Sequence, residues 1–383
     1  MKVALLAETS REYGREFLNG LAQFAQEQGG WLLRLFSPDD LKGRHPFAGF
    51  DGIITRAFND KAIRKLKASG LPVVDASHQT PTSEFIGVGS DDVAIASMAA
   101  AFFLERGFRN FAYCGYAGTG FSDTRAAAFR AAVAKHGFKV LKYTKHEPMD
   151  DDIIFDERMG QDAPDKSLRQ WIKTLPSGTA VFCANDMRAN QICKIAGEDG
   201  VRVPQDLSLL GVDNDSFLCL FSSTPLSSID PNAHGVGYSA ARLLLAAIQN
   251  PPPHKKRPIF RVRPGKLVER TSTAFRPISP EWLSDALVFI DRNRFQPLSA
   301  AEVVARCNRS AHTVAKAFLK NFGLTPGRYI TRMKMEEARR LVRLRTHSSK
   351  EIASLVGYTS PQYFCNAYRA YYGHSPFASS SYS

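Results

Sequence analysis

The last third of the chain contains one pattern twice, as SAAEVVARCNRSAHTVAKAFLKNFGLTP at 299–326 and as SSKEIASLVGYTSPQYFCNAYRAYYGHSP at 348–376. Both copies start with Ser-x-x-Glu, a capping box in which the serine oxygen and the glutamate carboxylate accept hydrogen bonds from free backbone N–H groups at a helix start. An apolar stretch, a turn and a second helix that begins at a serine follow in each copy. The repeat therefore predicts two successive helix-turn-helix units.

Corresponding residues of the two copies lie 50 positions apart. The pairs are Ser310 and Ser360, Phe318 and Tyr368, Phe322 and Tyr372, Gly323 and Gly373, and Pro326 and Pro376. The two serines are placed to cap a helix, and the aromatic pairs recur on one helix face. The turn of the first unit falls at Asn308, a residue type that tolerates a left-handed backbone.

A single helix is predicted between the two units, at 326–345, because apolar residues recur there at helical spacing. Twenty residues at about 1.5 Å each span roughly 30 Å. This length is close to the ~34 Å between successive major-groove faces of DNA. The pattern therefore predicts that one chain places two recognition helices in adjacent major grooves. The alternative is a plain helical bundle whose basic residues face water.

The positive charge of the chain is concentrated in this last third. The net charge of the 383 residues is +13, and residues 276–383 hold 16 Lys and Arg against 7 Asp and Glu. Residues 1–250 hold 27 Lys and Arg against 29 Asp and Glu and are close to neutral. This distribution favours a polyanionic partner for the last third, and double-stranded DNA fits both the charge and the repeat.

Composition excludes several classes of protein. A hydrophobic fraction of 44% is typical of a globular chain of two or three domains. The longest uncharged apolar run, Val93–Leu104, is shorter than the ~18 residues of a membrane span. The six cysteines contain no Cys-x-x-Cys pair, and no signal peptide pattern is visible, so we expect no zinc site and a cytoplasmic protein.

The first 275 residues alternate short apolar runs with amphipathic helical patterns. Strands are expected at 3–7, 52–55, 72–75, 110–116, 180–184 and 207–212, with helices between them that include 17–26, 93–105, 125–136 and 187–198. Such alternation predicts parallel sheets covered by helices on both faces, and the number of units favours two lobes.

Polar side chains follow several of these predicted strands. We select Glu8, Tyr13, Asp91, Arg125, Asn185, Asp186 and Asp213, and note that Asp92 adjoins Asp91. Ligands of parallel sheets bind beyond the carboxyl ends of the strands, and carboxylates, amides and arginine suit a polyhydroxylated ligand. At each single position the alternative is a helix N-cap, which Asp and Asn favour for their own sake.

Enzyme motifs are absent from this region. Gly115, Gly118 and Gly120 are spaced G-x-x-G-x-G, the reverse of the dinucleotide fingerprint, and neither a phosphate loop nor a Gly-x-Ser-x-Gly elbow occurs. We therefore expect no catalytic residue, no cofactor and no metal. The proline-rich stretch 251–280 suggests the boundary: a first domain at 1–275, which includes a strand-like segment at 259–268, a linker at 276–281, and a helical domain at 282–383.

The segment Leu298–Pro376 resembles the DNA-binding domain of the AraC/XylS family, through G-Y-x-S-x-x-Y-F at 357–364 and Phe/Tyr-Gly-x-Thr/Ser-Pro after each predicted recognition helix. The resemblance implies that His312 and Lys316 of the first unit, and Gln362 and Asn366 of the second, read base edges. The DNA-binding surface that we predict also includes Ser310, Thr313, Ser360 and Tyr363.

The first 275 residues resemble the sugar-binding core of LacI/GalR-type regulators and periplasmic sugar-binding proteins. The similarity lies in A-N-D at 184–186, G-V-D at 211–213, P-L-S-S-I at 225–229 and L-V-E-R-T-S-T at 267–273. It implies that Asp91, Arg125, Asn185, Asp186 and Asp213 contact a sugar.

The order of the two domains is similar to that of the xylose-regulator type within the AraC/XylS family. This implies a two-lobed α/β sensor domain followed by an all-α domain with two helix-turn-helix units. The implied function is sequence-specific transcription regulation, with a small sugar such as xylose or another pentose as effector. We expect an activator, a homodimer, RNA polymerase as a further partner and no membrane contact. The alternatives are a sugar-binding protein or a sugar-modifying enzyme without a regulatory role.

Overall fold

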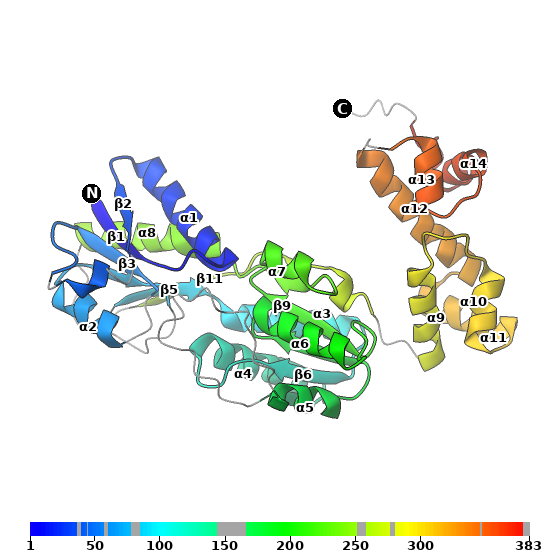
Figure 1. The fold of residues 1–383 in the computed structure, drawn as a ribbon, viewed down its shortest axis with the longest axis horizontal. Helices are drawn as coiled ribbons and strands as arrows, with labels where there is room; N and C mark the ends of the chain where they lie inside the picture. The colour runs from blue at the N-terminus through cyan, green and yellow to red at the C-terminus, as the bar shows by residue number, and fades with distance from the viewer. Residues whose placement is uncertain are drawn as a thin grey trace. The chain divides into compact units, whose positions relative to one another are not determined.

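A computed structural model describes residues 1–36, 40–43, 45–56, 60–77, 85–143, 166–250, 258–275, 280–344 and 347–377. The chain forms two compact units, Met1–Ala274 and Phe275–Ser383 (Figure 1). Residues 276–279 of the predicted linker lie outside the described residues.

The described part of the first unit contains two six-stranded sheets, which helices cover. The first sheet has the order β11-β5-β4-β3-β1-β2, with all neighbours parallel. Its strands are β1 (Lys2–Leu6), β2 (Leu32–Leu35), β3 (Gly52–Thr55), β4 (Val73–Asp75), β5 (Ile86–Ser90) and β11 (Ile259–Val262). The predicted parallel architecture is thus confirmed, and the short edge strand β2 is an element that the sequence pattern did not indicate.

The second sheet has the order β12-β10-β9-β8-β6-β7, in which only β12 runs antiparallel to its neighbour. Its strands are β6 (Asn110–Cys114), β7 (Val140–Tyr143), β8 (Thr179–Cys183), β9 (Leu207–Val212), β10 (Ser227–Ile229) and β12 (Leu267–Val268). We call the first sheet with its helices lobe 1 and the second sheet with its helices lobe 2.

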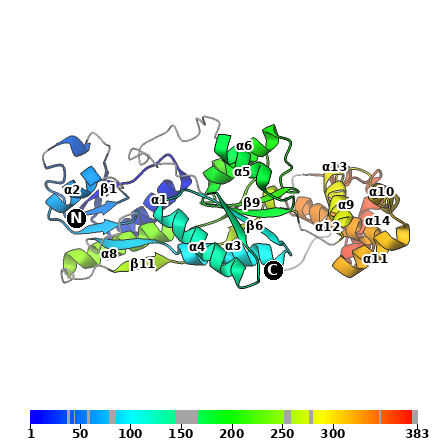
Figure 2. The same cartoon turned by 90° about the horizontal axis from the view of Figure 1, so that it is seen from below.

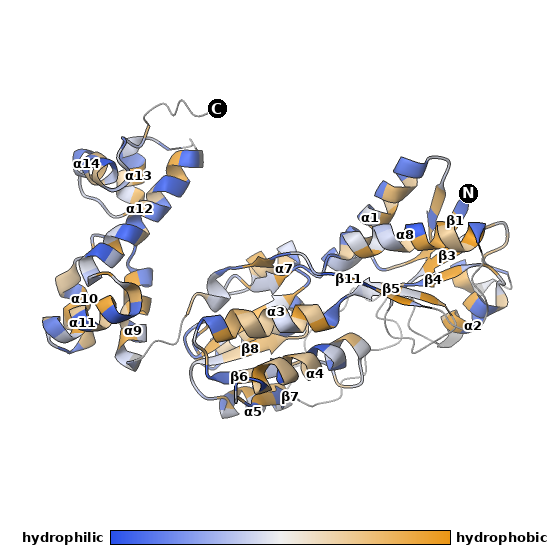
Figure 3. Ribbon diagram, turned by 180° about the vertical axis from the view of Figure 1, so that it is seen from behind, coloured by the Kyte–Doolittle hydropathy of each residue, from blue (hydrophilic) through white to orange (hydrophobic). Residues whose placement is uncertain are grey.

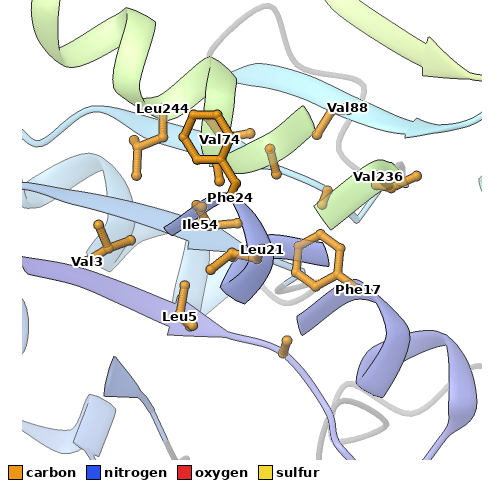
Figure 4. Close-up of a cluster of buried hydrophobic side chains, with 14 of the residues drawn as sticks. Val3, Leu5, Phe17, Leu21, Phe24, Ile54, Val74, Val88, Val236 and Leu244 are labelled. Carbon is orange, nitrogen blue, oxygen red and sulfur yellow. The ribbon is translucent and has the colours of Figure 1, made fainter. Parts of the chain in front are cut away.

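In lobe 1, α1 (Glu12–Gln28) and α8 (Ala233–Gln249) cover one face of the sheet, and α2 (Asp60–Ala68) covers the other. Figure 4 shows Leu5 of the sheet beside Leu21 of α1, and Val74 of the sheet beside Phe24 of α1 and Leu244 of α8. The two helices touch closely at a glycine, because a Cβ atom on Gly20 would lie 1.9 Å from the carbonyl oxygen of His234.

In lobe 2, alternate residues of the strands face two helical layers. Phe111 and Phe182 point toward α4 (Gly120–Ala134), where Phe129 packs on both rings. Ala112 and Val181 point toward α5 (Lys166–Thr174) and α6 (Asp186–Glu198). Figure 2 shows α3 (Asp92–Glu105) and α4 along one side of this sheet and α5 and α6 along the other.

One predicted element is corrected by the sheet topology. The segment 259–268 is not one strand, because β11 belongs to the first sheet and β12 to the second. The break falls at Pro264 and Gly265: proline has no N–H to donate, and a Cβ atom on Gly265 would lie 2.4 Å from a carboxylate oxygen of Asp230. The chain therefore crosses between the lobes here, as it also does after β5 and after β10.

The second unit is entirely helical in its described residues. It contains α9 (Glu281–Arg292), α10 (Ala300–Cys307), α11 (Ala311–Phe322), α12 (Pro326–Leu344), α13 (Ser349–Leu355) and α14 (Pro361–Tyr372). Two hydrophobic cores form, one among α9, α10, α11 and the start of α12, and the other among the rest of α12, α13 and α14. Figure 3 shows that α12 carries many hydrophilic residues, in contrast to the strands of the two sheets.

The helix starts predicted from the repeat are confirmed. Ser299 and Ser348 each form a capping box with the glutamate three residues on. Ser310 and Ser360 cap α11 and α14 by accepting hydrogen bonds from backbone N–H groups. Asn308 ends α10 in the left-handed conformation, with φ of 49°. The predicted helix 326–345 corresponds to α12.

Candidate ligand site and candidate nucleic-acid interface

The first candidate site lies where the carboxyl ends of β1 and β3 meet the start of α1. Glu8 follows β1, is 6% exposed and forms an ion pair with Arg56, whose Nη1 atom lies 2.9 Å from Glu8 Oε1. The Arg56 guanidinium also stacks on the ring of Tyr13, 4.1 Å from its centre. The three side chains therefore form one packed polar group on lobe 1.

Tyr13 links this group to the rest of the lobe and to lobe 2. Its hydroxyl lies 3.3 Å from Ser90 Oγ at the end of β5. Burial raises the pKa of Tyr13, the charge of Arg56 lowers it, and the charges of Asp92 and Asp213 raise it. Asp213 follows β9 of lobe 2, so the tyrosine is within electrostatic reach of both lobes.

Arg125 of α4 forms a buried ion pair with Asp92. The Nε atom donates to Asp92 Oδ1 at 2.8 Å, and Nη1 donates to the carbonyl oxygen of Ala184 at the end of β8. Burial lowers the pKa of Arg125, but the nearby charges of Asp92 and Asp213 raise it, and the net direction is upward. α4 begins at Gly120 rather than at Arg125, so the arginine stands in the second turn of the helix.

Asp213 completes the group from lobe 2. Its backbone has a φ of 109°, a conformation that is strained for a side-chain-bearing residue and that recurs at functional sites. Burial raises its pKa to about 6, although the charges of Arg125, Arg11 and Arg56 oppose that rise. We call Glu8, Arg11, Tyr13, Arg56, Asp92, Arg125 and Asp213 the interlobe cluster.

Three atoms of the interlobe cluster are buried without a hydrogen-bond partner among the described residues. They are Glu8 Oε2, Arg11 Nη2 and Arg56 Nε. A buried polar group without a partner costs about 1–3 kcal/mol. The cluster therefore holds one acceptor and two donors that a polar ligand can satisfy.

The other predicted residues of the first unit accept hydrogen bonds from backbone N–H groups. Asp91 caps α3 by accepting from Ala94 N, and Asn185 caps α6 by accepting from Arg188 N. Asp186 is fully buried; its Oδ2 accepts from the backbone N–H of Asp215, and burial raises its pKa well above the ordinary value. For Asp91 and Asn185 the structure thus shows the helix-capping bonds that the alternative interpretation anticipated.

The cluster also contains residues that our sequence selection omitted. Arg56 directly follows β3, so the rule of polar residues at strand ends was sufficient to find it. Arg11 precedes α1 and lies between Glu8 and Tyr13, both of which were selected. The Asp91–Asp92 pair was noticed, but only packing decides that Asp92 pairs with Arg125 while Asp91 caps the helix.

The second candidate site consists of α11 and α14. His312, Thr313 and Lys316 are exposed on α11, while Val314 and Phe318 of the same helix are buried. The Ser310 hydroxyl lies 2.8 Å from the Thr313 hydroxyl at the helix start. The polar face of α11 is therefore open to a partner.

The exposed face of α14 repeats this arrangement. Gln362, Tyr363 and Asn366 are exposed, and Tyr363 is 66% exposed although it is a large aromatic residue. Its ring lies 5.8 Å from that of Tyr358. An exposed face at the start of each second helix is the arrangement by which helix-turn-helix proteins present side chains to the DNA major groove.

No helix of the described residues is long and apolar enough to cross a membrane. Within those residues, no group of three or more His, Cys, Asp or Glu side chains is arranged to hold a metal ion.

Both units are similar to known proteins. A family model described as a periplasmic binding protein-like domain matches residues 100–273, and a helix-turn-helix domain model matches residues 303–378. A LacI-family regulator from Corynebacterium glutamicum covers 71% of this chain and 98% of its own, with 26% identity and a TM-score of 0.54.

Three further relatives match nearly the whole chain. The xylose operon regulatory protein of Escherichia coli K12 is 27% identical over 98% of this chain and 95% of its own length. The Haemophilus influenzae protein of the same name is 24% identical over 98% and 97%. The structure of the xylose-binding transcription activator xylR has 25% identity and a TM-score of 0.71, and covers 98% of this chain and 96% of its own.

These matches define the class of the protein. It is a DNA-binding transcription regulator in which a periplasmic-binding-protein-like domain precedes an AraC-type helix-turn-helix domain. Over almost its whole length it is a homologue of the xylose operon regulatory proteins. These relatives are regulators and not enzymes, in agreement with the regulator prediction and against the alternatives that lack a regulatory role.

Proposed function

We propose that the chain is a transcription activator controlled by a small sugar, with a pentose such as xylose as the first candidate, bound by the interlobe cluster. The observation that carries this proposal is the set of buried atoms without partners at Glu8, Arg11 and Arg56. A sugar hydroxyl both donates and accepts, so one ring satisfies a carboxylate and two guanidinium groups. The names of the full-length relatives, which refer to xylose, support the choice of sugar.

Residues of both lobes would hold the sugar. Glu8 and Asp213 accept from hydroxyl groups, Arg11, Arg56 and Arg125 donate, and Tyr13 offers an apolar ring beside them. Asp91, Asn185 and Asp186, selected from the sequence, belong to this proposal as residues that hold the ends of β5, β8 and β9 in place. In this structure the lobes already touch, since the backbone N–H of Glu12 donates to Asp215 Oδ2 at 3.2 Å and the Ser216 hydroxyl donates to Glu12 Oε2 at 3.2 Å.

The effector acts by shifting a population of lobe arrangements. A sugar that contacts both lobes favours the arrangement in which Glu8 and Asp213 are close, and the shift is limited by its differential affinity for the two states. The segments that connect the lobes after β5, after β10 and before β12 are the places where backbone angles change.

DNA is contacted by α11 and α14. His312 and Lys316, and Gln362 and Asn366, read base edges in two successive major grooves. Ser310, Thr313, Ser360 and Tyr363 contact the backbone or bases beside them. The 19 residues of α12 span about 28 Å at ~1.5 Å per residue, which suits recognition helices in adjacent grooves.

The protein acts in the cytoplasm as a homodimer that recruits RNA polymerase. An exposed apolar group on α7 (Ser216–Phe221) supports a contact with a second copy: Phe217 and Phe221 stack 4.5 Å apart and are 62% and 77% exposed. Large exposed apolar groups commonly mark protein contacts. Sedimentation of the wild type and of Phe221→Ser checks the dimer, and transcription in vitro with and without sugar checks activation.

The sugar site is tested by thermal shift with pentoses, hexoses and their phosphates. A ligand at 100 times its dissociation constant adds about 2.7 kcal/mol to the free energy of unfolding. Arg11→Ala removes a side chain whose Nη2 atom has no partner among the described residues, so the variant is expected to fold and to lose the shift. Arg15→Ala, at an exposed arginine in the first turn of α1, is the matched control. A full shift in Arg11→Ala would contradict the site.

A further inference from the structure

A lysine is buried in the middle of the helix that joins the two helix-turn-helix units. Lys334 of α12 is 7% exposed. Its Nζ atom donates to the carbonyl oxygen of Gln296 at 3.0 Å and to that of Gly357 at 3.1 Å. Gln296 lies between α9 and α10, at the first helix-turn-helix unit, and Gly357 lies between α13 and α14 of the second helix-turn-helix unit. One ammonium group therefore bonds to the backbones of both units.

The two backbones also touch directly at this place. A Cβ atom on Gly357 would lie 2.3 Å from the carbonyl oxygen of Gln296, and Gly357 has a φ of +72°. Only glycine meets both conditions without strain. The ring of Tyr358 covers the lysine, with Nζ 5.4 Å from its centre.

Lys334 stands between two separate hydrophobic cores. Ile330, one turn before it, belongs to the core of the first helix-turn-helix unit. Met335, the next residue, belongs to the core of the second helix-turn-helix unit. The contact of Lys334 with Gln296 and Gly357 is therefore a second link between the two helix-turn-helix units, in addition to the backbone of α12. Burial lowers the pKa of Lys334, and the charge of Glu302 raises it.

We propose that Lys334 is a positioning residue that fixes the orientation of the second helix-turn-helix unit relative to the first. α11 and α14 then bind two DNA segments whose separation and relative rotation about the DNA axis are fixed. The chemistry requires a compact group with several N–H donors, because two main-chain oxygens must be satisfied from one point. The inference rests on the proposed contact of both units with DNA.

The test uses duplexes selected from a random library by the full-length wild-type chain. Footprinting on these duplexes locates the two DNA segments that the protein protects from cleavage. One base pair is then inserted between these two protected segments, which rotates one segment relative to the other by about a tenth of a turn. Wild type is expected to lose about tenfold or more in affinity on insertion, because a rigid reader cannot follow the rotation. Lys334→Met is expected to bind the original duplex more weakly and to lose less than about threefold on insertion.

Three measurements make the result decisive. Arg340→Met removes an exposed positive charge from the same helix and should keep the wild-type spacing preference. Lys334→Arg retains a cation with several donors and should restore most of that preference. Circular dichroism establishes that each variant is folded, and Lys334→Gln, which keeps one donor group, replaces Lys334→Met if that variant does not fold.

Two outcomes would overturn the positioning role. One is a spacing preference in folded Lys334→Met equal to that of the wild type. The other is an equal loss of affinity for the complete duplex and for a duplex with one segment scrambled, which would indicate a general loss of folded protein. Failure of the underlying DNA proposal is distinguishable, because then the wild type itself would select no duplex with two protected segments.

Discussion

Arg125 and Asp92 form a buried ion pair, with 2.8 Å between Nε and Oδ1 and side chains that are 4% and 7% exposed. Removal of one partner leaves an uncompensated charge in the interior, which costs on the order of 3–5 kcal/mol. Replacement of both partners by neutral groups costs much less. A comparison of single and double variants of this pair therefore separates the contribution of Arg125 to stability from its contribution to ligand binding.

We predict that Arg125→Met lowers the free energy of unfolding by about 3 kcal/mol or more. The double variant Asp92→Asn/Arg125→Met should regain most of this loss and still lack the sugar-induced thermal shift. Urea unfolding measures the first quantity and the thermal-shift assay the second. Equal destabilisation in the single and double variants would show that the charge imbalance is not the cause.

The pH dependence of stability tests the environment of Asp213. The pKa of Asp213 is raised to about 6 in the folded protein, against about 3.9 in an unfolded chain. The folded state therefore binds this proton more tightly, so the contribution to stability is greatest below about pH 4 and falls as the pH rises to about 6. Asp213→Asn should unfold at higher denaturant concentration than wild type at pH 7, with a smaller difference at pH 4.

Asp206 supplies a control of opposite sign. The hydrogen bond from Arg202 lowers the pKa of Asp206 to about 2. Its contribution to stability is present above the unfolded pKa and is lost as the pH falls toward 2. Asp206→Asn should thus destabilise the protein at pH 7 and lose this effect in acid. A difference between wild type and Asp213→Asn that does not change with pH would refute the assignment for Asp213.

The base-reading residues are tested by sequence preference. Lys316→Ala and Gln362→Ala should relax the preference at separate positions of the selected duplex, each at a cost of about 1–3 kcal/mol for the preferred base pair. Arg369→Ala, at an exposed arginine near the end of α14, should weaken binding to specific and random duplexes alike. Fluorescence anisotropy on both duplexes measures the ratio. Parallel losses for all three variants would exclude base reading by Lys316 and Gln362.

The close packing of α1 on α8 is tested by alanine substitution of two glycines, one inside this contact and one outside it. Gly20→Ala places a Cβ atom 1.9 Å from a backbone oxygen of α8 and should strongly destabilise lobe 1. Gly197→Ala, in α6, meets no heavy atom within 4 Å and should be neutral or stabilise by about 0.4–1 kcal/mol. Thermal unfolding of both variants gives the comparison. Similar melting temperatures for the two would contradict the close contact.

Local signals explain why the helical domain was predictable. Ser299 and Ser348 begin helices through bonds to residues three positions away, so a short stretch of sequence contains the whole interaction. The exposure of Lys316 and Gln362 follows from the same local helical period. Lys334 was not singled out, because its partners at 296 and 357 are 38 and 23 residues away.

The interlobe cluster was only partly predictable. The rule of strand ends selected Glu8, Tyr13, Arg125 and Asp213, since a parallel strand presents its carboxyl end to the ligand edge. The same rule selected Asp91 and Asn185, whose side chains cap helices in the structure. Helix caps and ligand contacts use the same residue types at the same edge, so composition does not separate them.

The sequence by itself determined the two-domain order, the parallel α/β class of the first unit, the paired helix-turn-helix units of the second and the side chains that these helices expose. Periodicity, capping and turn residues act within a few positions, and these features depend on such interactions alone. The tertiary structure decided that Asp92 and not Asp91 faces Arg125, that Arg56 stacks on Tyr13, and that 259–268 divides between two sheets. Those outcomes depend on contacts between segments tens to hundreds of residues apart, which only the packed chain brings within bonding distance.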